Sequence, residues 1–213
     1  MMLRILFGSM AFALYASGTF ACEGQTGKVI FEDKFTDDAG GWSFGDDLIL
    51  NAPGATFTLE DSDDGNASTF FNETFTATQG DFCVEMTFPL DAAKVDAGIN
   101  VVFWGVDDSN YWDVYAGADG AVSLGKWVDD KWSTIFETTT NNLVKIGPTD
   151  VNSVHAIVKN GTITVVVNGQ TVKTIRAQIP SENLKFGFRG EYDKSSSKPV
   201  LFSVRSYKVT APE

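Results

Sequence analysis

Two closely spaced Asn-Gly pairs constrain the fold of this chain more than any other feature. Asn160-Gly161 and Asn168-Gly169 interrupt the β-branched stretch HAIVKNGTITVVVNGQTVKTI. Both central residues of a type I′ turn need a positive φ, and Asn-Gly adopts that conformation at low cost. The stretch therefore predicts two successive β-hairpins that form a three-stranded antiparallel meander.

The rest of the chain repeats this pattern. Short apolar or alternating runs are separated by Gly, Asn and Asp, and no long apolar pattern of helical period follows Cys22. Closely spaced short strands of this kind indicate an all-β sandwich or barrel. We predict strands at 28–35, 48–51, 56–59, 69–75, 81–88, 98–104, 111–116, 122–127, 131–137, 154–159, 162–167, 170–175, 183–189 and 200–209.

The first 21 residues have the layout of a secretory signal peptide. Arg4 precedes an apolar run from Ile5 to Tyr15, and small residues follow up to Ala21. The run is shorter than the ~20 apolar residues that a membrane helix needs. We expect cleavage after Ala21, which leaves 22–213 as a single β-sandwich domain of a secreted or periplasmic protein. The alternative is a buried N-terminal helix.

The chain contains two cysteines, Cys22 and Cys83. Two cysteines in an oxidising compartment predict one disulfide. Strand parity places Phe82 on the apolar face of its strand and Cys83 on the other face, where an N-terminal segment could reach it. A lipoprotein anchor on Cys22 is the less favoured alternative, because Phe20 and Thr19 match the lipidation motif poorly.

The charge of the chain disfavours some ligands. It has 28 acidic and 16 basic residues and a net charge of −12. Such a chain repels phosphate backbones, so nucleic acid is an unfavourable partner. The acidic run DSDDGN at 61–66 offers oxygen ligands, but Gly65 stands where an EF-hand loop has a ligand. We expect a solvated turn and no cofactor, with calcium at this turn as the alternative.

A succession of motifs spans nearly all of the predicted domain. VIFEDKFTDDAGGWSF is followed by GDFCVEMTF, AGINVVFWGVDDSNYWDVYAGADGAVSLGKWVDDKW, VNSVHAIVKNGTITVVVNGQTV, NLKFGFRG and VLFSVRSYKV. This order resembles the concanavalin A-like lectin/glucanase superfamily. It is most similar to the laminin G-like and 3-keto-disaccharide-hydrolase-like jelly rolls of secreted bacterial proteins. The resemblance implies two stacked antiparallel sheets, with ligands, often sugars, held on the concave face or at the loop rim.

Glycosidases of this superfamily carry carboxylates on one strand, as Glu-x-Asp-x-(x)-Glu, so that an acid and a base or nucleophile flank the scissile bond. This chain has no such triplet, because Asp113 stands alone in YWDVY. We therefore expect a glycan-binding, lectin-like domain without catalysis. The alternatives are a glycoside-active enzyme of the keto-sugar-hydrolase-like type and a structural or adhesive envelope protein.

The aromatic stretch NVVFWGVDDSNYWDVYAG is the candidate ligand surface. A sugar site combines a ring for the apolar face of a pyranose with polar groups for its hydroxyls, although most of these rings are expected in the core. Strand parity places Asn100 and Trp104 on one face. We predict ligand contacts from Asn100, Trp104, Trp112, Asp113 and Arg189. Trp112 and Asp113 have opposite parity, so both can face the ligand only if a bulge intervenes.

Overall fold

The strands of the computed structural model follow the predicted pattern. The structure describes residues 22–43, 48–140, 142–147 and 149–213, so the signal peptide predicted at 1–21 lies outside the described residues. The strands are β1 Val29–Asp33, β2 Leu48–Leu50, β3 Ala55–Leu59, β4 Asn66–Phe71, β5 Gly80–Thr87, β6 Ala97–Asp107, β7 Asn110–Gly117, β8 Ala121–Val128, β9 Lys131–Thr139, β10 Val151–Lys159, β11 Thr162–Val167, β12 Gln170–Arg176, β13 Lys185–Tyr192 and β14 Val200–Thr210. Two short helices, η1 Cys22–Gly24 and α1 Ala92–Val95, were not predicted.

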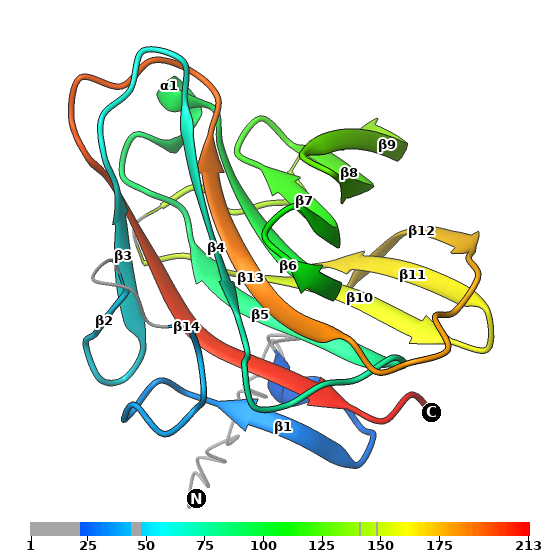
Figure 1. The fold of residues 1–213 in the computed structure, drawn as a ribbon. Helices are drawn as coiled ribbons and strands as arrows, with labels where there is room; N and C mark the ends of the chain where they lie inside the picture. The colour runs from blue at the N-terminus through cyan, green and yellow to red at the C-terminus, as the bar shows by residue number, and fades with distance from the viewer. Residues whose placement is uncertain (1–21, 44–47, 141, 148) are drawn as a thin grey trace, which may run out of the picture.

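The strands form two antiparallel sheets. One sheet has eight strands in the order β12-β11-β10-β5-β14-β3-β2, and β1 pairs with β14 beside this path. The other has six strands in the order β4-β13-β6-β7-β8-β9. Figure 1 shows the six-stranded sheet crossing over the larger one, with β7, β8 and β9 at one side. The predicted two-sheet antiparallel sandwich is confirmed.

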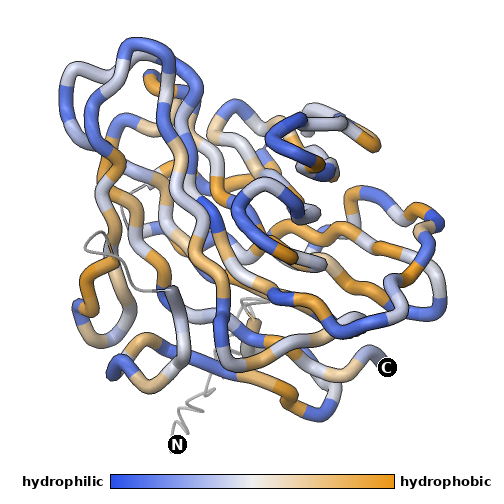
Figure 2. The backbone as a smooth tube through the Cα atoms, viewed as in Figure 1, coloured by the Kyte–Doolittle hydropathy of each residue, from blue (hydrophilic) through white to orange (hydrophobic). Residues whose placement is uncertain are grey.

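Alternate residues of the two sheets fill the space between them. Phe82 of β5 is fully buried, and its ring centroid lies 6.0 Å from that of Phe186 on β13 and 5.9 Å from that of Phe103 on β6. These contacts join the two sheets. Figure 2 shows the resulting alternation of hydrophobic and hydrophilic residues along the strands. The two-residue alternation predicted from the sequence therefore determines which side chains point into the core.

Both Asn-Gly turns have the predicted backbone. The φ angles are 49° and 78° at Asn160 and Gly161, and 48° and 76° at Asn168 and Gly169. β10 pairs with β11, and β11 pairs with β12. The predicted three-stranded meander is confirmed.

The N-terminal segment covers the outer face of β5. Cys22 and Cys83 form a disulfide with a Cα–Cα distance of 5.6 Å, as predicted. The backbone N–H of Cys22 donates to Glu85 Oε1 at 3.1 Å, and the Ser206 hydroxyl donates to Glu85 Oε2. Cys83 and Glu85 thus point away from the core, as parity predicts, and the N-terminal segment helps to bury them.

The loop at 193–199 between β13 and β14 is mostly exposed, as is the acidic turn at 61–66. Within the described ranges, no group of three or more His, Cys, Asp or Glu side chains is placed to hold a metal ion. A solvated turn without a cofactor stays the prediction for 61–66, with calcium as its alternative. The part of the chain that the structure describes also contains no helix that is long and apolar enough to cross a membrane.

Candidate functional site

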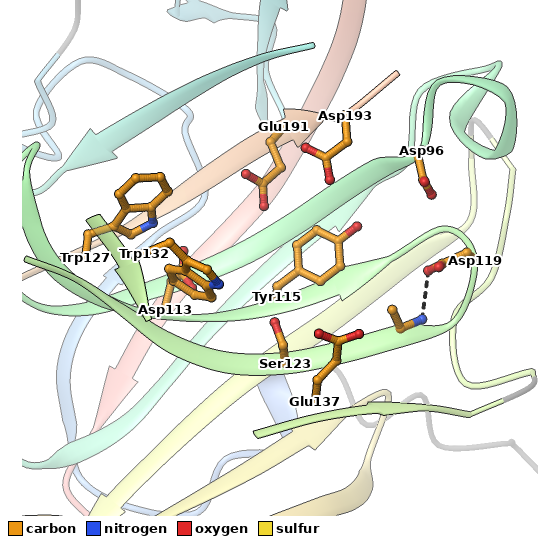
Figure 3. A pocket seen from close by; sticks show the side chains of 11 residues that line it. Asp96, Asp113, Tyr115, Asp119, Ser123, Trp127, Trp132, Glu137, Glu191 and Asp193 are labelled. Carbon is orange, nitrogen blue, oxygen red and sulfur yellow. Dashed lines mark hydrogen bonds between the residues drawn. The ribbon is translucent and has the colours of Figure 1, made fainter. Parts of the chain in front are cut away.

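A groove of about 390 Å³ lies on the face of the six-stranded sheet that points away from the core (Figure 3). This volume lies within the range of small-ligand sites. Six of the lining side chains are carboxylates, so we call it the acidic groove. It is lined by Asp96, Asp113, Asp119, Glu137, Glu191 and Asp193, by the rings of Tyr115, Trp127 and Trp132, and by Ala121 and Ser123.

Strand register brings groups from five strands to one level of the groove. On β7, Asp113 and Tyr115 face the groove, while Val114 between them packs in the core. Tyr115 pairs with a residue on each neighbouring strand, and the pairing continues outward in both directions. The line across β13, β6, β7, β8 and β9 is Arg189, Asn100, Tyr115, Ser123 and Glu137.

Two glycines make room for aromatic rings in this groove. A Cβ on Gly98 would collide with the Tyr115 ring, and a Cβ on Gly125 would collide with the Trp132 indole. Each ring can therefore lie across the backbone of a neighbouring strand. Trp127 pairs with Trp132 across β8 and β9, and their ring centroids are 5.7 Å apart. Because 37% of Trp132 is exposed, its ring can stack on a ligand.

A connected set of polar side chains forms the floor of the groove. Asn100 Nδ2 donates to Asp113 Oδ2 at 3.2 Å and to Glu191 Oε1 at 3.1 Å. Arg189 holds the other oxygen of Glu191, with Nη2 and Nε at 2.6 and 3.0 Å from Oε2. Its Nη1 also donates to the Tyr111 hydroxyl at 2.9 Å. The structure thus joins the predicted residues Asn100, Asp113 and Arg189 through Glu191.

Asp113 is the most perturbed carboxyl of the floor. Only 1% of the residue is exposed. Burial and, secondly, repulsion from Glu191 raise the pKa of Asp113 from 3.8 to about 7, although Arg189 and Asn100 act against this rise. Among the described residues, neither Asp113 Oδ1 nor Asn100 Oδ1 has a hydrogen-bond partner. Asp113 can therefore hold or release a proton near neutral pH.

The structure does not bring Trp104 and Trp112 to this groove. Trp104 has a φ of 52° at a register shift in β6, so its ring packs in the core and its indole N–H donates to the Thr78 carbonyl at 2.7 Å. The parity prediction that Trp104 shares a face with Asn100 is therefore wrong. Trp112 also packs against the core, with Lys126 Nζ 5.8 Å from its ring centroid. Of the two neighbours Trp112 and Asp113, which have opposite parity, only Asp113 faces the groove.

Of the residues that line the groove, only Asp113 was predicted from the sequence, and those not predicted include Trp127, Trp132 and Glu191. Trp127 and Trp132 flank the two-residue turn at Asp129 and Asp130, whose φ angles are 49° and 60°. A two-residue turn fixes which residues of its two strands lie opposite each other. This turn was the signal in the sequence that could have placed the two indoles side by side. Glu191 lies two residues after Arg189 on the same face, beyond the predicted end of that strand.

The comparisons with known proteins concern the fold. No protein-family model matches the chain, and no curated protein matches it either. Superposition on the laminarinase catalytic domain of Thermotoga maritima gives a TM-score of 0.66 over 89% of this chain and 100% of that domain, at 8% identity. The β-glucanase of Bacillus licheniformis gives 0.61 over 87% and 99%, at 15% identity. The chain has the concanavalin A-like jelly-roll fold.

A further jelly roll in the comparison is a binding module. The carbohydrate-binding module CBM66 of Bacillus subtilis gives a TM-score of 0.54 over 78% of this chain and 94% of the module, at 15% identity. The resemblance to the superfamily that the motifs suggested is thus confirmed for the fold. The narrower similarity to laminin G-like and keto-disaccharide-hydrolase-like proteins stays a prediction.

Proposed function

We propose that the acidic groove binds a glycan and does not cleave it. The observation that carries this proposal is the Trp127–Trp132 pair beside the polar floor. Sugar rings present apolar C–H faces that stack on indoles, and their hydroxyls pair with amides and carboxylates. The names of the structural neighbours, which include glucanases and a carbohydrate-binding module, support a glycan ligand.

The arrangement of the carboxylates supports binding rather than hydrolysis. Hydrolysis needs an acid and a base or nucleophile that are both free to act on the scissile bond. The residues next to Asp113 on its own face of β7 are Tyr111 and Tyr115, which are phenols. Glu191 is held by Arg189 and Asn100 on both of its oxygens. Asp113 therefore has no carboxylate neighbour on its own face of β7, and the carboxylate to which Asn100 joins it is not free.

A second candidate function is glycoside cleavage, and one observation favours it. A carboxyl with a pKa of about 7 can act as a general acid near neutral pH. Incubation of the protein with neutral and amino-sugar oligosaccharides and with 3-keto-disaccharides, followed by mass spectrometry, tests this function. Products that form with the natural protein and not with Asp113→Asn would replace the binding proposal by an enzymatic one.

The proposal also places the protein outside the cytoplasm, in secreted or periplasmic form. Disulfides persist in oxidising compartments, so the Cys22–Cys83 bond supports this location. A structural or adhesive envelope protein would share the same compartment. A glycan array separates these functions, because an adhesive protein that recognises only protein would bind none of the immobilised glycans.

Trp132→Ala is expected to weaken binding of the best array glycan about tenfold while the protein remains folded. The exposed indole loses about 1–2 kcal/mol of apolar burial against the sugar, and 1.4 kcal/mol corresponds to a factor of ten. Isothermal titration calorimetry and a thermal melt measure the two effects. Trp104→Phe is the control, since it removes the donor to Thr78 in the core and should lower stability without changing affinity. Unchanged binding by folded Trp132→Ala would contradict a role for this indole.

A further inference from the structure

The negative charges of the acidic groove outnumber the positively charged side chains close to it. Among the described residues that line it, none is a Lys, Arg or His. Arg189 lies in the floor and pairs with Glu191. Lys194 Nζ lies 3.2 Å from Asp96 Oδ2, but 60% of the lysine side chain is exposed, so this pair is weak. Three further carboxylates, Asp119, Glu137 and Asp193, face the groove without a cation of their own in the described part of the chain, and Asp113 is a fourth when it is ionised.

The carboxylates also repel one another across the groove. Burial raises the pKa of Asp193, and the nearby carboxylates of Glu191 and Asp96 raise it further. Asp113 experiences the same repulsion from Glu191. A ligand cation would relieve this repulsion, whereas an anionic ligand would increase it.

Two buried acceptors at the floor have no hydrogen-bond partner in the described part of the chain, and one of them belongs to Asp113, which lines the groove. Asp113 Oδ1 and Asn100 Oδ1 have no donor among the described residues, and only 1% of either residue is exposed. Buried acceptors in proteins are nearly always satisfied, by protein groups, water or ligand. Asp113 also lines the groove (Figure 3), so a bound donor can reach its carboxyl. This observation is independent of the acidic rim and indicates a donor-rich ligand.

The spread of the carboxylates argues against a metal ion as this ligand. No three of the described acidic side chains converge at metal-binding positions. Instead they lie on different strands and loops along the groove, from Glu137 on β9 to Asp193 after β13. A metal ion would need several ligand oxygens around one point. Separate ammonium groups on an extended ligand match this distribution better.

We propose that the glycan bound in the acidic groove carries protonated amino groups, as an oligosaccharide of glucosamine does. This inference rests on the proposed function, because the tryptophan pair supplies the sugar platform. Each ammonium offers three hydrogen-bond donors and a positive charge, so it can satisfy a buried acceptor and neutralise a carboxylate together. A neutral glycan supplies donors without charge.

The test compares three glycans of equal length by isothermal titration calorimetry at mildly acidic pH and low salt. The probes are fully deacetylated chitosan hexaose, fully N-acetylated chitin hexaose and cellohexaose. We expect the deacetylated hexamer to bind about tenfold more tightly than the other two, and this preference to shrink as salt rises. Glu137→Gln and Asp193→Asn should each lower the ratio of amine to N-acetyl affinity about threefold, whereas Asp38→Asn, exposed and outside the groove, should not.

The outcomes separate this inference from the function on which it rests. Equal affinities for the three hexamers, with a loss on Trp132→Ala, would overturn the preference for amines and keep the glycan-binding function. Binding to none of the three, nor to any glycan of the array, would overturn both. Binding that requires a divalent cation and disappears with a chelator would also overturn the ammonium proposal.

Discussion

The free energy of unfolding of the double variant Cys22→Ser, Cys83→Ser is expected to be about 4 kcal/mol lower than that of the natural protein. The disulfide spans 61 residues of sequence, and in the chain-entropy model a loop of this length restricts the unfolded state by about that amount. The bond also fixes the N-terminal segment over β5, where Cys22 N–H reaches the buried Glu85. Urea denaturation of both proteins measures the difference.

Two controls accompany this experiment. Natural protein unfolded in the presence of a thiol reductant should match the double variant, because both lack the same crosslink. Intact mass and alkylation of the purified protein then report the state of Cys22. A diacylglyceryl adduct, or two thiols that alkylate without reduction, would contradict the disulfide, since an acylated Cys22 sulfur cannot bond to Cys83.

Asp113→Asn is expected to stabilise the protein at pH 8 by up to about 4 kcal/mol and to change its stability little at pH 4. The folded-state pKa of Asp113 is raised from 3.8 to about 7, and each pKa unit corresponds to 1.36 kcal/mol. The folded state therefore keeps a proton that the unfolded state has lost. This relative stabilisation is complete below about pH 3.8 and disappears as the pH rises through about 7. The asparagine of the variant does not titrate, so the variant does not lose this stabilisation as the pH rises.

Urea denaturation at pH 4, 5.5 and 8 measures this dependence. Asp108→Asn is the matched control, because it makes the same chemical change at an exposed position outside the groove. We expect its stability difference from the natural protein to be similar at the three pH values. A gain from Asp113→Asn that is equal at pH 4 and pH 8 would show that the ionisation of Asp113 is not its cause.

The fold could be predicted because its determinants are local. Asn160-Gly161 and Asn168-Gly169 specify their turns without reference to the rest of the chain, and each short alternating run reports its own strand. Parity also placed Cys83 on the outer face of β5, within reach of Cys22. The order of strands within each sheet depends on distant pairings such as β5 with β14, which no local pattern encodes.

The site was predicted only as far as regular parity extends. Asn100 and Asp113 lie on uninterrupted stretches of β6 and β7, and both were placed among the ligand residues. Trp104 was misplaced because a positive φ and a register shift turn its ring toward the core. Trp132 reaches the groove because Gly125 leaves space for it on the next strand, and this dependence between two strands appears only in three dimensions.

The position of β9 has a consequence for how the groove accommodates ligands. Within the described part of the chain, β9 pairs with β8 alone, and most of its residues are exposed. β6 and β7 have a strand on each side. The backbone hydrogen bonds of β9, on the Trp132 side of the groove, should therefore open more often than those of β6 and β7 in the floor. In hydrogen–deuterium exchange, the β9 amides should therefore exchange first. The groove would then combine a stiff base with one compliant wall, and under the proposed function this wall would let the groove admit sugar rings of different bulk.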